Sequence, residues 1–439
     1  MIRVGHETII PSVSMKDASF PSPFASELEF SVPARGTWTI VHVGMLVPEA
    51  HEIFVCGAGC LRGVVLSAAE MNLTNRFSTV AIEEHNVVEG DMEDLIIDGV
   101  TDILNRLPHL PKSVLVYSSC IHLFMGCDLD MCFNVLRERF PSVDFTDCYM
   151  NPTMRKSGLT PDRIMRRQLY SLLKPVKKKD KHCAIVGNCF SIEDRSDLVR
   201  LIGSAGWTVH QITDCKTYEE YLKMAECTVC ISTQSVAKAG GTALGERLDM
   251  KHLYLPVSYE SEEIRKHMSD LADTIGASYD GDFAEESEAD EAMNRAKALI
   301  GDTPIAIDYT FTSRPLELAK RLIKYGFNVV KLFADFFSGE EKKAYLWLGK
   351  NAPEIEVSPT VHPAMRRYPY DSEEKVLALG QKAAYFTDTP YFVNIVENGS
   401  LYGFDGIKHL AKLMEEAFTE PKDTERIIGI KGLECETCL

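Results

Sequence analysis

The sequence lacks any apolar run that approaches the roughly 20 residues needed for a membrane-spanning helix. Its first residues, MIRVGHETII, contain no apolar stretch of the kind found in secretory signals. Its last residues, ECETCL, do not place a cysteine fourth from the end, as prenylation would require. Short repeats and low-complexity tracts are also absent. We therefore expect a cytoplasmic protein that has no membrane partner.

Positive charge is in deficit, because 47 Lys and Arg stand against 64 Asp and Glu and give a formal net charge of −17. This balance disfavours a general binder of nucleic acid or anionic membrane, since both need a basic surface. The acidic charge does not exclude a basic protein partner. The G-x-x-x-x-G-K-[ST] phosphate-binding loop is missing as well, so the chain does not look like an ATPase.

What the sequence does contain is an alternation of strand-like apolar runs and amphipathic helical patterns. This alternation predicts an α/β fold of three Rossmann-like domains, with mainly parallel sheets flanked by helices. The 439 residues are long enough for two to four domains. We expect an N-terminal arm and first unit over residues 1–175, a second unit over 182–300, a third over 303–419 and a polar tail over 420–439.

Thirteen cysteines are present, and this odd number cannot be accounted for by disulfides alone. A reducing compartment favours metal or redox roles over disulfides. The alternative is that a cysteine is only a small buried hydrophobic residue. The position of each cysteine relative to the predicted strands therefore distinguishes a ligand from a buried residue, because ligands bind beyond the carboxyl ends of parallel strands.

Two pairs of cysteines follow predicted strands of the first unit. The run EIFVC ends at Cys56, and Cys60 follows a glycine-rich turn that lets a bulky inorganic cluster approach the backbone. The run SVLVY is followed by Cys120 and then by Cys127. Because both turns fall on one edge of a parallel sheet, the four thiolates could converge on an iron–sulfur cluster. A structural zinc site and a set of buried thiols are the alternatives.

These motifs resemble those of the nitrogenase component 1 superfamily, which includes the molybdenum–iron protein and the dark-operative protochlorophyllide reductases. The resemblance covers about residues 36–419. Cys-Gly-Ala-Gly-Cys, ending at Cys60, is similar to the family's His-Gly-Pro-x-Gly-Cys turn. Ser-Ser-Cys, ending at Cys120, and Met-Gly-Cys-Asp after it are similar to the family's Ser-x-Cys and Gly-Asp-Asp segments. Leu-Tyr-Gly-Phe-Asp-Gly, ending at Gly406, is similar to its closing Gly-Tyr-Asp-Gly helix.

The resemblance implies an iron–sulfur cluster, [4Fe–4S] or larger, with Cys60 and Cys120 among its ligands. It also implies an ATP-dependent iron–sulfur reductase partner that delivers electrons, and a homodimer or a heterodimer with a homologous subunit. The expected function is a nitrogenase-like reductase subunit whose substrate is unidentified. The alternative is a non-catalytic scaffold or carrier for metal-cluster assembly.

The sequence also departs from the family pattern. Residues 1–55 contain no cysteine, whereas the family has an earlier cluster cysteine there. Cys56 and Cys127 stand where the family has other residues, and they are candidates to replace the missing ligand. Cys230, at the end of CTVC, is the candidate ligand of a second metal cofactor. Val393 stands near the place of the family's cofactor histidine, which disfavours a nitrogenase-type cofactor.

Four further features carry weaker expectations. Cys189 ends the first strand of the second unit, where ligands often bind. His122 lies close to Cys120 and could tune a cluster by hydrogen bonding. Cys132 falls inside a predicted helix and is expected in the core. The tail pair Cys435 and Cys438 forms a C-x₂-C motif that could bind metal or change redox state.

Overall fold

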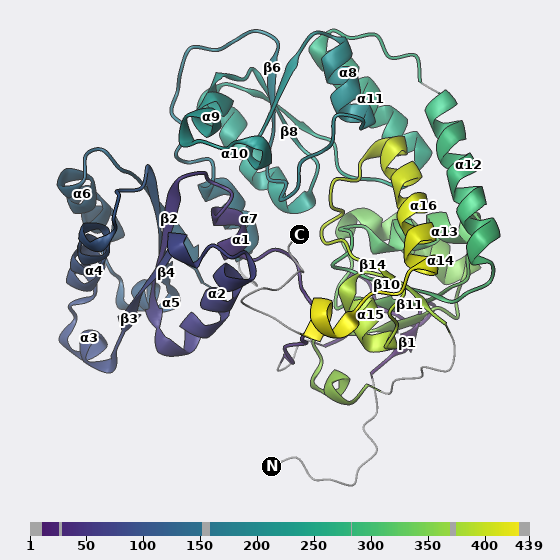
Figure 1. Ribbon diagram of the computed structural model, residues 1–439, viewed down its shortest axis with the longest axis horizontal. Coiled ribbons are helices and arrows are strands. Elements are labelled where there is room, and N and C mark those ends of the chain that lie inside the picture. The colour runs from purple at the N-terminus through teal and green to yellow at the C-terminus, as the bar shows by residue number, and fades with distance from the viewer. Residues whose placement is uncertain (1–10, 26–28, 152–158, 282, 369–374, 430–439) are drawn as a thin grey trace.

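The computed structural model describes residues 11–25, 29–151, 159–281, 283–368 and 375–429. Within these residues the strands form three sheets, which lie at the left, at the top and at the lower right of Figure 1. Every strand pairing is parallel except one, and helices flank the sheets. The expected α/β class with mainly parallel sheets is thus confirmed. The tail pair Cys435 and Cys438 lies outside the described residues.

The first sheet has the order β3-β2-β4-β5 and is parallel throughout. Strand β2 is buried on both faces, which explains why its sequence reads as a nearly continuous apolar run. Its side chains alternate, so Val55 faces the core beneath α4 and α6 whereas Cys56 faces the opposite core. The elements of this unit are α1 (Ile40–Gly44), β2 (Ala50–Gly57), α2 (Ala58–Glu70), β3 (Phe77–Ile82), α3 (Glu84–Glu89), α4 (Met92–Arg106), β4 (Ser113–Ser119), α5 (Cys120–Met125), α6 (Leu129–Arg139), β5 (Asp144–Met150) and α7 (Pro161–Gln168).

The second sheet has the order β7-β6-β8-β9 and is also parallel. Short strands, of which the central β6 and β8 are largely buried, alternate with helices, as the βαβ pattern of the sequence predicts. Two longer helices then lead toward the third sheet. The elements are β6 (His182–Ile185), α8 (Asp197–Ser204), β7 (Thr208–Gln211), α9 (Tyr218–Leu222), β8 (Val229–Ser232), α10 (Lys238–Leu248), β9 (Lys251–Tyr254), α11 (Ser261–Ile275) and α12 (Phe283–Ile300).

The third sheet has the order β1-β12-β11-β10-β13-β14. It shares one hydrophobic core with the second sheet, and helices α12 and α16 pack together across that core. The division of the chain at 175/182 and at 300/303 therefore stays a prediction. The elements are β1 (Val13–Ser14), β10 (Ile305–Asp308), α13 (Pro315–Lys324), β11 (Val329–Phe333), α14 (Lys342–Asn351), β12 (Glu356–Ser358), β13 (Leu377–Leu379), α15 (Gln381–Thr387), β14 (Phe392–Val393) and α16 (Gly403–Thr419).

The N-terminal arm packs on the third sheet, not on the first unit to which the sequence analysis joined it. Strand β1 pairs antiparallel with β12, with Val13 opposite Val357. Met15 is buried in the core shared by the second and third sheets, and Ala34 is buried against the third sheet. The pairing fills the hydrogen-bonding edge of β12, which would otherwise stay open. At the other end of the chain, Ile428 of the described tail is buried in the same third-sheet cluster as Ala34.

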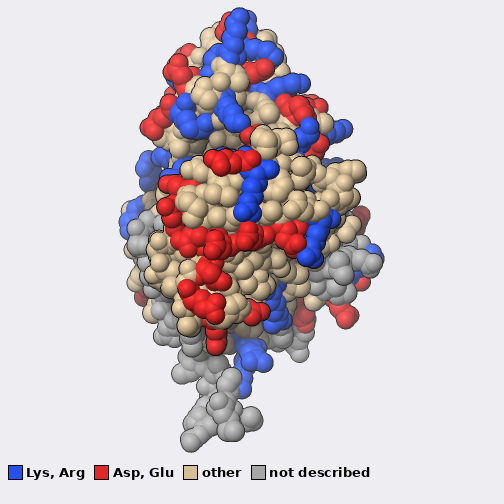
Figure 2. Space-filling model, turned by 90° about the vertical axis from the view of Figure 1, so that its left-hand side faces the viewer, with Lys and Arg blue, Asp and Glu red and all other residues tan. Residues whose placement is uncertain are grey.

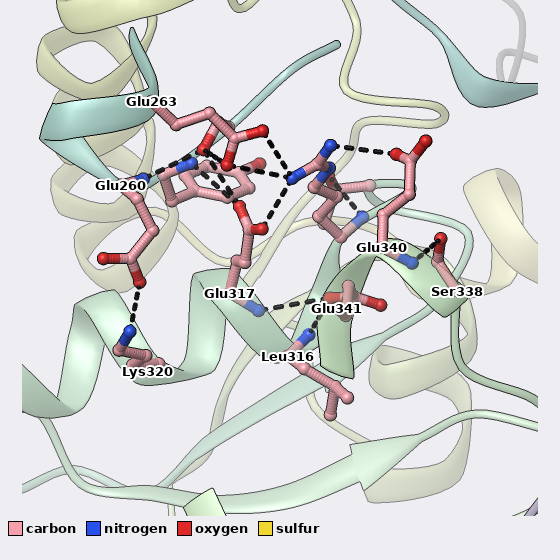
Figure 3. Close-up of polar contacts among 12 residues, drawn as sticks. Glu260, Glu263, Leu316, Glu317, Lys320, Ser338, Glu340 and Glu341 are labelled. Carbon is pink, nitrogen blue, oxygen red and sulfur yellow. Dashed lines mark hydrogen bonds and ion pairs between the residues drawn. The ribbon is translucent and has the colours of Figure 1, made fainter. Parts of the chain in front are cut away.

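An ionic cluster around Arg314 ties α11, α13 and the turn before α14 together (Figure 3). The Arg314 guanidinium is almost fully buried and donates to Glu317 at 2.6 Å, to Glu340 at 2.9 Å and to Glu263 at 3.2 Å. Glu341 is fully buried beside it and accepts the backbone N–H of Leu316 at 2.7 Å. Burial raises the pKa of the Glu341 carboxyl to about 8. This side chain therefore keeps its proton at neutral pH.

The raised pKa of Glu341 makes the stability of the protein depend on pH. Between about pH 5 and pH 8 the unfolded chain loses this proton and the folded chain keeps it, so rising pH favours unfolding by at most about 1.4 kcal/mol per pH unit. The Glu341→Gln variant has an amide in place of this carboxyl group, and the amide does not titrate. The melting temperature of the variant relative to wild type should therefore rise from pH 5.5 to pH 8, as measured by differential scanning calorimetry.

The exposed carboxylate Glu354 supplies the control, because Glu354→Gln should show no such trend over the same pH range. A constant difference between Glu341→Gln and wild type at all pH values would show that Glu341 ionises alike in the folded and unfolded chains.

Candidate functional site

The first strand-to-helix turn places Cys56 and Cys60 at the carboxyl edge of the first sheet. Strand β2 ends at Gly57, and helix α2 begins at the next residue. Cys56 is fully buried, whereas Cys60, on the first turn of α2, is exposed. A Cβ atom added at Gly59 would meet no atom within 4 Å. The turn therefore combines one buried and one accessible thiol beside open space.

The second turn places Cys120 at the same edge. Strand β4 ends at Ser119, and Cys120 is the first residue of α5 and half-buried. Ser119 caps this helix, and its backbone N–H donates to His122 Nδ1 at 3.0 Å. Strands β2 and β4 are parallel neighbours, with Val55 opposite Ser118. Both turns therefore lie side by side, as the sequence pattern predicts.

Three of the four candidate ligand thiols are neighbours. Burial, together with the nearby Cys60 and Cys120 thiols, raises the pKa of the Cys56 thiol to about 12. Without a metal Cys56 is therefore a neutral thiol, and a metal bound there would have to displace its proton. This mutual influence identifies Cys56, Cys60 and Cys120 as one group.

Cys127 lies on the other side of α5. Its backbone N–H donates to the carbonyl of His122 at 3.1 Å, and its side chain packs against the core beneath α4 and α6. Burial raises the pKa of its thiol, and the Glu93 carboxylate of α4 raises it further. The next residue, Asp128, donates its N–H to Glu93 at 2.9 Å. The structure thus brings Cys127 to α4 and not to the group formed by Cys56.

His122 and Cys132 both lie inside the protein. Burial lowers the pKa of the His122 imidazole, and its Nε2 atom is buried without a partner among the described residues. Because Nδ1 accepts the Ser119 N–H, the proton of the neutral ring belongs on Nε2. Cys132 is fully buried, with its sulfur 3.8 Å from the carbonyl oxygen of Glu93, as expected for a core residue.

The two helices that begin at the cysteine turns, α5 and α2, carry exposed apolar side chains. On α5, Leu123, Phe124 and Met125 are 60%, 71% and 43% exposed. On α2, Val65 and Leu66 are 40% and 39% exposed. Contiguous apolar side chains on a surface mark interaction sites. We call these five residues the apolar border of the cysteine edge.

Acidic side chains gather on the outer helices of the same unit. This unit lies at the left of Figure 1 and therefore faces the viewer in Figure 2, where a band of acidic side chains crosses the surface. Such a surface attracts basic partners and repels acidic ones. Exposed acidic residues of the helices in this unit include Glu84, Glu89, Asp94, Asp98, Asp102, Asp130 and Glu138.

Cys230 lies in the core between the second sheet and α10, away from the cysteine edge. It is fully buried, with its sulfur 3.6 Å from the carbonyl oxygen of Gly241, and burial raises the pKa of its thiol to about 12. Val393 is buried in β14. Among the residues that the structure describes, no three His, Cys, Asp or Glu side chains are arranged to hold a metal ion by themselves.

A buried polar junction between the units was not found from the sequence. The guanidinium of Arg166 on α7 donates to Glu397 at 2.9 Å, to the sulfur of Cys189 at 3.3 Å and to the carbonyl of Gly187 at 2.9 Å. Glu397 in turn accepts the N–H of Trp38 at 2.9 Å. Only the strand-end position of Cys189 gave a sequence signal for this junction.

Comparison with known proteins decides the family. The model of the nitrogenase component 1 type oxidoreductases matches residues 41–419. The chain belongs to this family. The expected relationship is therefore confirmed. No curated protein gives a significant match, and no described helix is long and apolar enough to cross a membrane.

Two solved structures of a nitrogenase component 1 type protein, nitrogenase Cp1, share this fold. The structure at pH 6.5 is 15% identical with a TM-score of 0.65, over 90% of this chain and 94% of that chain. The structure at pH 5 is 12% identical with a TM-score of 0.54, over 92% and 94% respectively. At these identities the likeness shows the fold alone.

The different surroundings of the thiols predict different rates of alkylation. In protein prepared without iron, iodoacetamide at pH 8 should label the exposed Cys60 rapidly. It should leave the buried Cys56 unlabelled until denaturant is added, because both burial and protonation protect that sulfur. Timed quenching followed by peptide mass spectrometry measures both rates.

Cys132 is the internal control and should stay unlabelled in the folded protein. Labelling of Cys56 at the rate of Cys60 would contradict the burial of Cys56.

Proposed function

We propose that this chain is a subunit of a nitrogenase-like iron–sulfur reductase that accepts electrons from an ATP-dependent iron–sulfur partner and reduces a substrate. The carrying observation is the group of Cys56, Cys60 and Cys120 at the carboxyl edge of the first sheet. Membership of the oxidoreductase family supports the reaction class.

Because no three of the described side chains are arranged to hold a metal ion by themselves, a cluster at this edge would need ligands from a second chain. Iron–sulfur clusters are usually held by four cysteine thiolates, and this edge offers three thiols beside open space at Gly59. The apolar border of the cysteine edge supports a second, homologous chain at this surface, as a homodimer or a heterodimer. Such a chain would bury the border and add the missing ligands. The bound cluster would supply one-electron transfer.

The acidic outer face of the first unit supports a partner with a basic docking surface. Complementary charge raises the rate of association and suppresses wrong partners. The electron-delivering partner implied by the family would thus recognise the first unit.

The position of Cys230 favours a chain without a nitrogenase-type second cofactor. Its sulfur faces the core beside Gly241, and Val393 offers no imidazole nitrogen. This arrangement also suits the second candidate function, a carrier that assembles or transfers a metal cluster. In the reductase, electrons pass from the partner to a substrate. In the carrier, iron and sulfide pass to another protein.

The first prediction of this proposal concerns iron. Anaerobically purified protein should contain iron and acid-labile sulfide, and Cys60→Ala and Cys120→Ala should each lose most of it because each removes a ligand. Cys127→Ala and Cys132→Ala should keep it, because both side chains face the α4 side of the first unit. Iron and sulfide assays with EPR spectroscopy measure the content.

Circular dichroism of each alanine variant checks that it folds like the wild-type protein. Equal iron content in all four variants, or stoichiometric zinc without sulfide in wild type, would refute the assignment.

The second prediction separates the reductase from the carrier. Stopped-flow absorbance should show reduction of the protein by its iron–sulfur partner only when ATP is hydrolysed. A non-hydrolysable ATP analogue should give less than about one tenth of that rate if hydrolysis is required. Absence of ATP-dependent reduction, together with efficient transfer of iron and sulfide to an apo-protein, would support the carrier.

A further inference from the structure

A cavity of about 610 Å³ opens where the three units meet. Helix α7 of the first unit forms one wall and α10 of the second unit forms another. Ser338, Gly339 and Glu340, in the turn before α14, form the third. Binding cavities for small molecules typically measure about 300–1,000 Å³. The cavity is therefore large enough for a small organic molecule, and residues from all three units line it.

Three cationic side chains line this cavity. Arg163 and Arg167 are four residues apart on α7 and so project from one face of that helix. Lys238 begins α10, and its ammonium lies 4.4 Å from the centre of the Tyr254 ring. None of the three forms an ion pair with another described residue. In a protein whose net charge is −17, an unpaired trio of cations in one cavity calls for an anion.

The two acidic residues of the cavity do not cancel this charge. Glu340 accepts from Arg314 at 2.9 Å and from the Tyr254 hydroxyl at 2.9 Å (Figure 3). Because the Arg314 guanidinium also pairs with Glu263 and Glu317, it offsets only part of the charge of Glu340. Glu246 lies two turns along α10 from Lys238. The three cations are thus opposed by two carboxylates in the lining, which leaves an excess of positive charge.

The walls are held in place by close helix packing. A Cβ atom at Gly240 of α10 would lie 2.8 Å from the carbonyl oxygen of Arg166, so only glycine allows α10 to approach α7 this closely. Arg166 itself is buried and donates to Glu397 at 2.9 Å. The cavity therefore lies on a helix that is anchored to the junction of the units.

The remaining lining suits an organic ligand. Hydroxyl groups of Ser235 and Ser338 can donate hydrogen bonds to anionic oxygens. Leu159 and Ala243 add apolar surface. Arginine guanidinium groups bind carboxylates and phosphates with paired hydrogen bonds.

We propose that this cavity binds the substrate of the reductase, and that this substrate is an organic anion with at least two negative charges on carboxylate or phosphate groups. Arg163, Arg167 and Lys238 hold the anionic groups, and the alanine and leucine side chains contact the carbon skeleton. The identification of the bound anion as a substrate rests on the proposed function. Binding of the anion itself does not require a cluster.

Isothermal titration calorimetry of the full-length protein tests the site, with glutarate and glycerol 3-phosphate as probes and with diethyl glutarate as the uncharged control. At least one dianion should bind, the ester should not, and binding should weaken with added salt. Arg163→Gln combined with Arg167→Gln should weaken binding at least tenfold, and so should Lys238→Gln. The matched control Arg137→Gln on α6 removes an exposed arginine outside the cavity and should leave binding unchanged.

The outcomes separate this inference from the proposed function. Preference for glutarate or for glycerol 3-phosphate identifies a carboxylate or a phosphate substrate. Absence of binding by both dianions, equal binding of the ester, or binding unaffected by the cavity variants would overturn the site. ATP-dependent reduction by the partner with no anion binding would refute only this inference. Anion binding to the cavity in a protein that never takes up iron would refute only the reductase.

Discussion

The guanidinium of Arg166 is almost fully buried, so its charge has to be compensated inside the protein. Glu397 provides that compensation from a turn of the third unit, while Gly187 and Cys189 of the second unit accept the other hydrogen bonds. One side chain of the first unit thereby links all three. Removing one partner of a buried ion pair typically costs about 3–5 kcal/mol, so the placement of the units depends on this contact.

The same helix connects the two places where chemistry is proposed. Helix α7 packs against β5, whose carboxyl end lies at the cysteine edge with Met150 opposite Ser119. It also carries Arg163 and Arg167 into the cavity. The first unit therefore presents thiols at an exposed, apolar surface and cations at the exposed rim of the cavity. This arrangement separates a surface for another protein from a space for a small molecule.

Sequence reasoning succeeded where a local rule decides the outcome. Parallel strands end at one edge, so the neighbourhood of Cys56 and Cys120 followed from two strand ends. It did not place Cys127, because the chain turns at Gly126, whose positive φ of 70° reverses its direction after α5. The alternation of side chains along β8 shows that Cys230 faces the core, but this can be seen only when the strand and the helix that covers it are known. The Arg166–Glu397 pair joins residues distant in the chain, and no periodic pattern records such a pair.

The pairing of β1 with β12 has a consequence for how the chain is made. Val13 emerges from the ribosome early, and its partner Val357 emerges only when most of the chain has been translated. The first and second sheets contain only strands that are near one another in sequence, so they can form during synthesis. The arm must wait, with its strand unpaired, until the third sheet appears. Such a long-range contact raises contact order and slows the final step of folding, so a nascent chain spends most of its translation time with the strand of the arm unpaired.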